Sequence, residues 1–271
     1  MIYDIFSFYG EYHLLELRIK ENWDYIDRFI LVQGDKTFQG NNKSKLFGGE
    51  DNEKFKWSLE KLEVHNVALK SRDDPTLKSP WDNENLQISY VDNFIKSKNE
   101  DDLFFFGSID EIPNKKKIPE IINNYKTPLT MEQDFFYYAF NNKVINSKWT
   151  GTILLKKKDI QHNSLTNIFN KRYFELPRIA SGGWHFSFLG DSNEIIKKIE
   201  SYSHNEYNTE YFKNKSNIEK KIKESIDIYE RKKGDKNLGG QDPLIMEKVI
   251  IDSSFPDYLK NNKEKFNKYI F

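Results

Sequence analysis

The sequence predicts a single α/β domain in which helices flank a mostly parallel central sheet. In the first 107 residues, short apolar runs alternate with segments of helical periodicity, in the order strand, helix, strand, loop, strand, helix, strand. This alternation is typical of parallel sheets with helices on their faces. The 271 residues contain no internal repeat and no convincing linker, so one domain over residues 1–271 is the simplest prediction.

In the first half of the chain, the spacing of apolar residues predicts the helices and strands. An apolar run without a breaker predicts a strand, and Leu86, Tyr90 and Phe94, four residues apart, predict a helix. The polar, Gly-containing stretches 34–51 and 71–80 predict loops. The predicted elements are strands 2–8, 28–33, 61–69 and 103–107, and helices 11–23 and 82–98.

The second half has a different pattern, with longer strands and fewer helices between them. Aromatic and β-branched residues concentrate in three stretches, which favours strands there. The predictions are strands 129–141, 149–157 and 182–190, and helices near residue 118 and at 193–202 and 217–231.

Composition excludes several classes of protein. The formal net charge is zero, which argues against a general nucleic-acid surface. No cysteine is present, so a disulfide scaffold is excluded. No apolar run has the length of a membrane span, and the N-terminus lacks the pattern of a signal peptide. We therefore expect a soluble protein without a membrane anchor, in the cytoplasm of a bacterium or of a virus-infected host.

The stretch DDLFFFGSIDEIPNKKK, residues 101–117, contains the strongest candidate site. A buried strand ends there and is followed at once by Ser108, Asp110 and Glu111. In open α/β sheets, ligands bind at the carboxyl ends of the strands. Carboxylates are ligands of Mg²⁺ and Mn²⁺, and such a cation can stabilise a diphosphate leaving group. The alternative is an ordinary turn before the helix near residue 118, which Pro113 and Pro119 would favour.

Two further stretches contain candidate binding residues. In SGGWHFSF, residues 181–188, His185 is either a ligand that completes a metal site or a core histidine with a structural hydrogen bond. In SPWDNENLQ, residues 79–87, Glu84 and Gln87 lie three apart on one helix face, where they either hydrogen-bond a sugar or base or face water. The sequence lacks several common binding and catalytic motifs, namely the Gly-rich phosphate loops of the Walker and dinucleotide types, the Gly-x-Ser-x-Gly elbow, and two histidines at zinc-ligand spacing.

Taken in order, these stretches resemble glycosyltransferase family 17, the bisecting N-acetylglucosaminyltransferase family. The opening block, residues 6–40, carries the family's pattern of Glu11, Leu15, Glu16, Arg18 and Asp27. SPWDNENLQ, DDLFFFGSIDEIP, GGWHFSF, SYSHNEYN and FPDYLKNNKEKF resemble the later family blocks. The resemblance covers nearly the whole chain. It departs from the family at three positions, namely Ser108 for the usual Asp, Gln33 for a common Glu and Ile88 for a common Arg.

The resemblance implies a GT-A type fold and an inverting, metal-dependent transferase. Residues 1–113 would then form the nucleotide-sugar-binding half and residues 114–271 the acceptor-side half. The implied partners are a UDP-sugar donor, with UDP-N-acetylglucosamine expected, and a glycan acceptor. Asp110 and Glu111 would act in catalysis and, with His185, bind Mn²⁺ or Mg²⁺. The donor-binding residues would be Ser108, Gln33, Thr37, Trp81, Glu84, Gln87 and Trp184.

The general base is predicted from chemistry. A single-displacement inversion needs a group that takes the proton of the acceptor hydroxyl. Asp242, in the loop GGQDP, is the first candidate, because a Gly-rich loop can close over an acceptor; Asp134 is the second. Two rival functions stay open at this point, a metal-dependent nucleotide-sugar hydrolase and a non-catalytic carbohydrate-binding relative.

Overall fold

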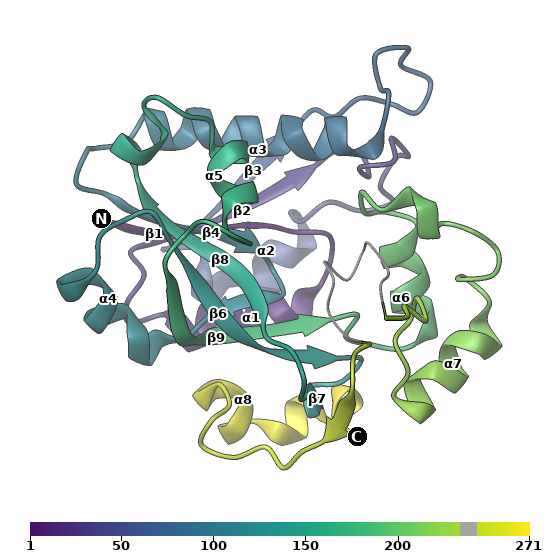
Figure 1. Ribbon diagram of the computed structural model, residues 1–271. Helices are drawn as coiled ribbons and strands as arrows, with labels where there is room; N and C mark the ends of the chain where they lie inside the picture. The colour runs from purple at the N-terminus through teal and green to yellow at the C-terminus, as the bar shows by residue number, and fades with distance from the viewer. Residues whose placement is uncertain (234–242) are drawn as a thin grey trace.

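A computed structural model describes residues 1–233 and 243–271, with a 10-stranded sheet at its centre (Figure 1). The strand order is β10-β7-β6-β8-β4-β1-β2-β3, and β9 pairs with both β6 and β5. The strands are β1 (Ile2–Ser7), β2 (Arg28–Gly34), β3 (Leu62–Val67), β4 (Leu103–Ser108), β5 (Glu111–Pro113), β6 (Leu129–Tyr137), β7 (Asn142–Val144), β8 (Trp149–Lys156), β9 (Arg178–Ser187) and β10 (Met246–Lys248). The α-helices are α1 (Tyr12–Asn22), α2 (Glu50–Lys54), α3 (Pro80–Lys96), α4 (Ile118–Asn124), α5 (Leu165–Lys171), α6 (Ser192–Ile199), α7 (Lys215–Glu224) and α8 (Asp257–Asn261).

The α/β class is confirmed, but the prediction of a mostly parallel sheet is wrong because the sheet is mixed. Strands β3, β2, β1 and β4 are parallel neighbours, and β6 is parallel to β9. Strand β8 runs antiparallel to both β4 and β6, and β7 runs antiparallel to β6. The reason lies in the connections. Parallel neighbours need a long crossover, which α1 and α3 supply in the first half, whereas the short link from β6 through β7 to β8 permits antiparallel pairing.

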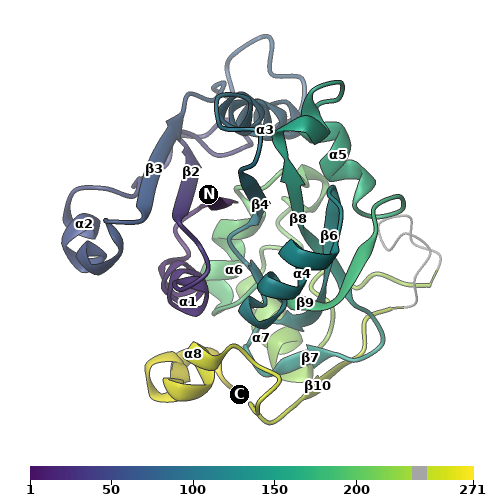
Figure 2. The same ribbon diagram turned by 90° about the vertical axis from the view of Figure 1, so that its left-hand side faces the viewer.

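Helices cover both faces of the sheet (Figures 1 and 2). Strand β4 is buried on both sides: Phe105 joins the core under α1, and Phe104 and Phe106 join the core under α3 and α5. This explains why it appears in the sequence as a continuous apolar run. A third core lies beneath α6 and α7, at the end of the sheet formed by β6, β7 and β9. Among the described residues, no helix combines the length and apolarity needed to cross a membrane.

The ends of α6 and α7 follow from local sequence. Asp191 caps α6 by accepting hydrogen bonds from the amides of Asn193 at 3.0 Å and Glu194 at 3.1 Å. The Glu194 carboxylate accepts the Asp191 amide at 2.8 Å, which completes a capping box. Helix α7 ends at Glu224, earlier than predicted, because Ser225 takes a left-handed conformation with φ 52°.

Candidate active site

A buried arginine holds the acidic turn between β4 and β5. Arg18, on α1, is fully buried and pairs with Asp4 of β1 through Nε–Oδ2 and Nη2–Oδ1 contacts of 2.8 and 2.7 Å. Its Nη1 donates to the main-chain carbonyls of Ser108 at 2.6 Å and Glu111 at 2.9 Å. One guanidinium therefore joins β1, α1 and both ends of the turn, which fixes the direction in which Asp110 leaves the sheet.

Asp110 forms an ion pair inside the protein. Its Oδ2 lies 2.7 Å from the Nζ of Lys198 on α6, and its Oδ1 lies 3.8 Å from Nδ1 of His185 on β9. Burial by itself raises the pKa of the Asp110 carboxyl, but the positive charge of Lys198 outweighs it and holds that pKa below its usual value. Burial lowers the pKa of His185 to about 4, so its imidazole is neutral near pH 7. Asp110 is thus an anion compensated by an ammonium group.

Glu111 faces different partners from Asp110. Its Oε1 accepts the indole N–H of Trp149 at 2.7 Å, and its Oε2 accepts the amide of Ser108 at 3.1 Å. A Cβ at Gly107 would lie 2.5 Å from Oε2, so only glycine leaves space for this carboxylate. Burial raises the pKa of Glu111, against the opposing charge of Arg172. These contacts give Glu111 the role of holding the turn in shape.

The three predicted metal ligands do not form a set that fits a divalent cation. His185 and Trp149 stack with ring centroids 4.3 Å apart, and the indole N–H of Trp149 holds the Glu111 carboxylate. Lys198 occupies one oxygen of Asp110. Within residues 1–233 and 243–271, no group of three or more His, Cys, Asp or Glu side chains is placed to hold a metal ion. Of the predicted ligands, Asp110 alone has a carboxylate that faces a cation directly, and that cation is an ammonium.

Three of the predicted donor-binding residues meet at one cavity. Ser108, Glu84 and Gln87 line a space of about 60 Å³ at the carboxyl end of β4 and beside α3. Ser7, at the end of β1, contributes to the same wall, and the apolar lining includes Phe38 and Phe169. Burial raises the pKa of Glu84, whose carboxylate accepts a hydrogen bond from the Ser203 hydroxyl. The candidate residues that the sequence indicated in α3 and at the acidic turn thus line the same cavity.

Gln33, Thr37 and Trp81 lie elsewhere around this edge. The Gln33 amide is fully engaged inside the protein, since it donates to the Phe47 carbonyl at 3.1 Å and accepts the Phe47 amide at 2.9 Å. The Thr37 hydroxyl accepts the Asn41 amide at 3.1 Å and so closes a turn. Trp81, at the start of α3, is 42% exposed and contacts His204 edge-on. Only Trp81 presents a free surface to a ligand.

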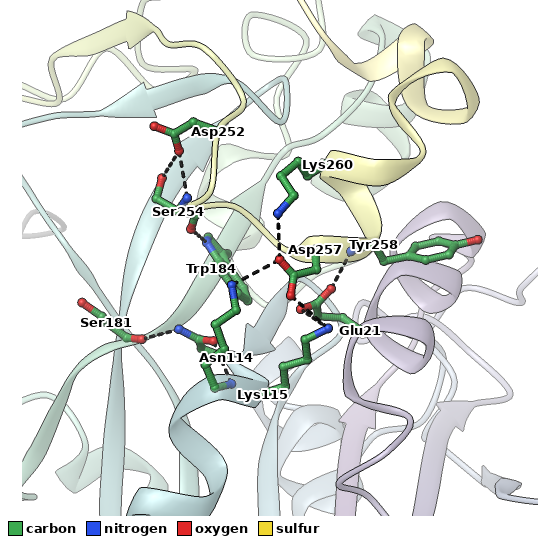
Figure 3. Close-up of polar contacts among 11 residues, drawn as sticks. Glu21, Asn114, Lys115, Ser181, Trp184, Asp252, Ser254, Asp257, Tyr258 and Lys260 are labelled. Carbon is green, nitrogen blue, oxygen red and sulfur yellow. Dashed lines mark hydrogen bonds and ion pairs between the residues drawn. The ribbon is translucent and has the colours of Figure 1, made fainter.

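Trp184 does not lie with His185. Successive residues of a strand point to opposite faces, so Trp184 enters the core beneath α8 while His185 turns toward Asp110. Its indole N–H donates to the Ser254 carbonyl at 2.9 Å, beside the contacts of Asp257 with Lys115 and Lys260 (Figure 3). Its assignment to donor binding is therefore corrected, because this residue fixes the C-terminal segment to the sheet.

The two predicted bases have different outcomes. Asp134, on β6, forms ion pairs with Lys143 and Lys148, and these contacts lower the pKa of its carboxyl in spite of partial burial. A carboxylate with a lowered pKa and two ammonium partners is a weak proton acceptor. Asp242 lies outside the described residues.

Sequence reasoning missed the positive charges of this region. Lys198 looks like any other lysine of a surface helix, and nothing in its sequence context marks it. Arg172, which follows α5, is buried and stacks on the ring of Phe169 at 3.4 Å, and its charge acts on both Glu84 and Glu111. The sequence singled out Glu11 by its place in the opening block, but it did not predict that Glu11 lies near Asp110 and Lys198. Burial raises the pKa of Glu11 there.

Comparison with known families identifies the family of the whole chain. Residues 1–270 match the profile of glycosyltransferase family 17, which is essentially the whole chain. No curated protein matches the chain. The match includes the acidic turn, the α3 segment that lines the cavity and the His185 strand. The chain belongs to glycosyltransferase family 17 and is a glycosyltransferase.

Proposed function

We propose that the protein has a GT-A type site that transfers a sugar, with inversion, from a nucleotide-sugar donor to a hydroxyl of a glycan. The observation that carries this proposal is the cavity where β1 and β4 end, lined by Ser108, Glu84 and Gln87. The carboxyl edge of parallel strands is the usual place for a nucleotide. UDP-N-acetylglucosamine is the proposed donor, because it is the donor that the family resemblance implies.

The lining of the cavity suits one end of such a donor. Phe38 and Phe169 offer apolar surface to a planar base, and Ser108, Glu84 and Gln87 offer hydrogen-bonding groups to a base or a ribose. A space of about 60 Å³ is too small to enclose a nucleoside, so the diphosphate and sugar would extend past its mouth. Asp110, which follows Ser108 by two positions in the chain, would then lie near the diphosphate.

The proposed reaction is a single displacement at the anomeric carbon. The acceptor hydroxyl oxygen forms a bond to this carbon as the bond to the diphosphate oxygen breaks, and the electron pair leaves with the nucleoside diphosphate. A base takes the hydroxyl proton. Asp242 stays the proposed base, and its contacts make Asp134 the weaker candidate. Binding of Mn²⁺ or Mg²⁺ also stays a prediction. The contacts of Glu111 with Trp149 and of Lys198 with Asp110 support it less than they support the other parts of the proposal.

A panel of nucleotide sugars tests this function. We expect UDP-N-acetylglucosamine to raise the free energy of unfolding by about 2.7 kcal/mol at a hundredfold excess over its Kd. Gln87→Ala should weaken that effect, whereas Asn93→Ala, on the exposed face of the same helix, should not. NMR of the glycan product should show an inverted anomeric configuration.

Three results would contradict the proposal. A product with retained configuration would refute inversion. Donor turnover that no glycan accelerates would favour a nucleotide-sugar hydrolase. Absence of binding by every nucleotide sugar, together with binding of glycans, would favour a non-catalytic carbohydrate-binding protein.

A further inference from the structure

The ion pair between Lys198 and Asp110 stands at the point where the family resemblance places a metal. Lys198 Nζ lies 2.7 Å from Asp110 Oδ2, and the two side chains are 29% and 7% exposed. The carboxylate is therefore deep, and the Lys198 side chain keeps part of its surface exposed. Among the described residues, His185 is the other group within ion-pairing distance of Asp110, at 3.8 Å, and its imidazole is neutral near pH 7 because burial lowers its pKa to about 4.

The segment that carries Lys198 is tethered to the loop after β2 and to α3. The Gln39 amide donates to the carbonyls of Ile199 at 3.0 Å and Tyr202 at 3.2 Å. A few residues further on, the Ser203 hydroxyl donates to the Glu84 carboxylate, which lines the cavity. The end of α6 and the turn after it thus contact the nucleotide-side wall, and Lys198 reaches Asp110 from a tethered backbone.

An ammonium group in this place has the chemistry that a diphosphate needs. Lysine has three N–H donors, and Asp110 takes one of them. A ligand oxygen on the solvent side can accept another, in a charge-assisted hydrogen bond. Glu111 and His185, the other expected ligands, are engaged with Trp149 by a hydrogen bond and by stacking respectively.

We propose that Lys198, held by Asp110, supplies the positive charge that a divalent cation would bring to the donor diphosphate, so that this chain binds its donor and transfers the sugar without metal. The proposal rests on the proposed function. As the bond from the anomeric carbon to the diphosphate breaks, the electron pair moves onto the leaving oxygen, and the Lys198 N–H groups stabilise the growing charge. Lys198 keeps its proton throughout, and Asp110 orients it.

Calorimetric titration with UDP, in EDTA and in Mn²⁺, tests this assignment on the intact chain. The wild-type Kd should agree within about twofold between the two buffers, and transfer should continue in EDTA. Lys198→Met should weaken UDP binding in EDTA on the order of 10- to 100-fold, the range expected for a hydrogen bond to a charged group. Lys197→Met, which removes the neighbouring exposed lysine of the same helix, should bind like wild type.

A second variant keeps the test decisive if Asp110, left without its partner, destabilises the fold. Asp110→Asn with Lys198→Met removes both charges at once, and UDP should again bind weakly in EDTA. Mn²⁺ should restore binding in Lys198→Met, whose Asp110 carboxylate is released, but not in the double variant.

Wild-type binding or transfer that EDTA abolishes and Mn²⁺ restores would overturn the assignment while leaving the proposed function intact. Wild-type affinity of Lys198→Met for UDP in EDTA would overturn it as well. Failure to bind any nucleotide or to transfer any sugar in either buffer would overturn the proposed function, and this assignment with it.

Discussion

Replacing Arg18 with Met tests how the active-site turn is built. The guanidinium is fully buried, pairs with the equally buried Asp4 through two contacts, and donates to the carbonyls of Ser108 and Glu111. Met keeps the apolar stem but leaves the Asp4 charge and two carbonyls without their donor. Breaking one side of a buried ion pair costs about 3–5 kcal/mol. For a domain of this size, that loss lowers Tm by roughly 6–20 °C.

Urea and thermal unfolding would measure this change, and Arg28→Met is the matched control. Arg28 lies at the start of β2, its side chain is 38% exposed, and its ion pair with Glu63 spans 3.4 Å. Exposed pairs of this kind contribute about 0–1 kcal/mol. If Arg18→Met proves no more destabilising than Arg28→Met, the guanidinium does not hold the turn as its contacts indicate.

A double variant separates the ion pair from the turn contacts. Asp4→Asn combined with Arg18→Met removes the buried charge along with its partner, so part of the stability should return. UDP binding, which we expect Arg18→Met to weaken, should stay weak in the double variant, because the carbonyls of Ser108 and Glu111 still lack their donor and the turn is not held. Recovery of both properties together would mean that Arg18 contributes to stability alone.

Three further predictions concern pH, the C-terminal segment and the cavity. Burial lowers the pKa of His185 to about 4 from 6.5, so its contribution to stability is complete above pH 6.5 and is lost as the pH falls toward 4. His185→Gln removes this titrating group, so the fall in the free energy of unfolding between pH 7.5 and pH 4.5, measured by denaturant titration, should be smaller than in the wild type by up to roughly 3 kcal/mol. Asp257 has ion pairs with Lys115, Lys116 and Lys260 that hold its pKa below the ordinary value of 3.8, so the stabilisation that they give is present above that pH. Asp257→Asn should lower the free energy of unfolding by about 1–2 kcal/mol at pH 7 and speed proteolysis near α8. Unchanged cleavage would show that these ion pairs do not hold the C-terminal segment. Ser108→Ala removes a hydrogen-bonding group from the cavity and should weaken UDP binding about fivefold by calorimetry, whereas an unchanged Kd would place the nucleotide elsewhere.

Several features could be predicted from the sequence because their causes are local. The apolar run of β4 and the helical spacing of α3 both have the predicted type, with boundaries within two residues of the prediction. The acidic turn lies at the carboxyl end of β4 because chain order alone places it there. Glu84 and Gln87 share a helix face, and α3 brings that face to the cavity that Ser108 lines.

Tertiary structure decided the charge of the site. Pairing of β5 with β9 sets Glu111 opposite His185, and the packing of α6 brings Lys198 to Asp110 across 88 positions of the chain. The mixed sheet likewise depends on how β8 inserts between β4 and β6, which no local pattern encodes. Sequence spacing specifies which face a residue occupies, but contacts between distant segments depend on packing. For that reason the carboxylates were predictable, and the ammonium group that compensates Asp110 was not.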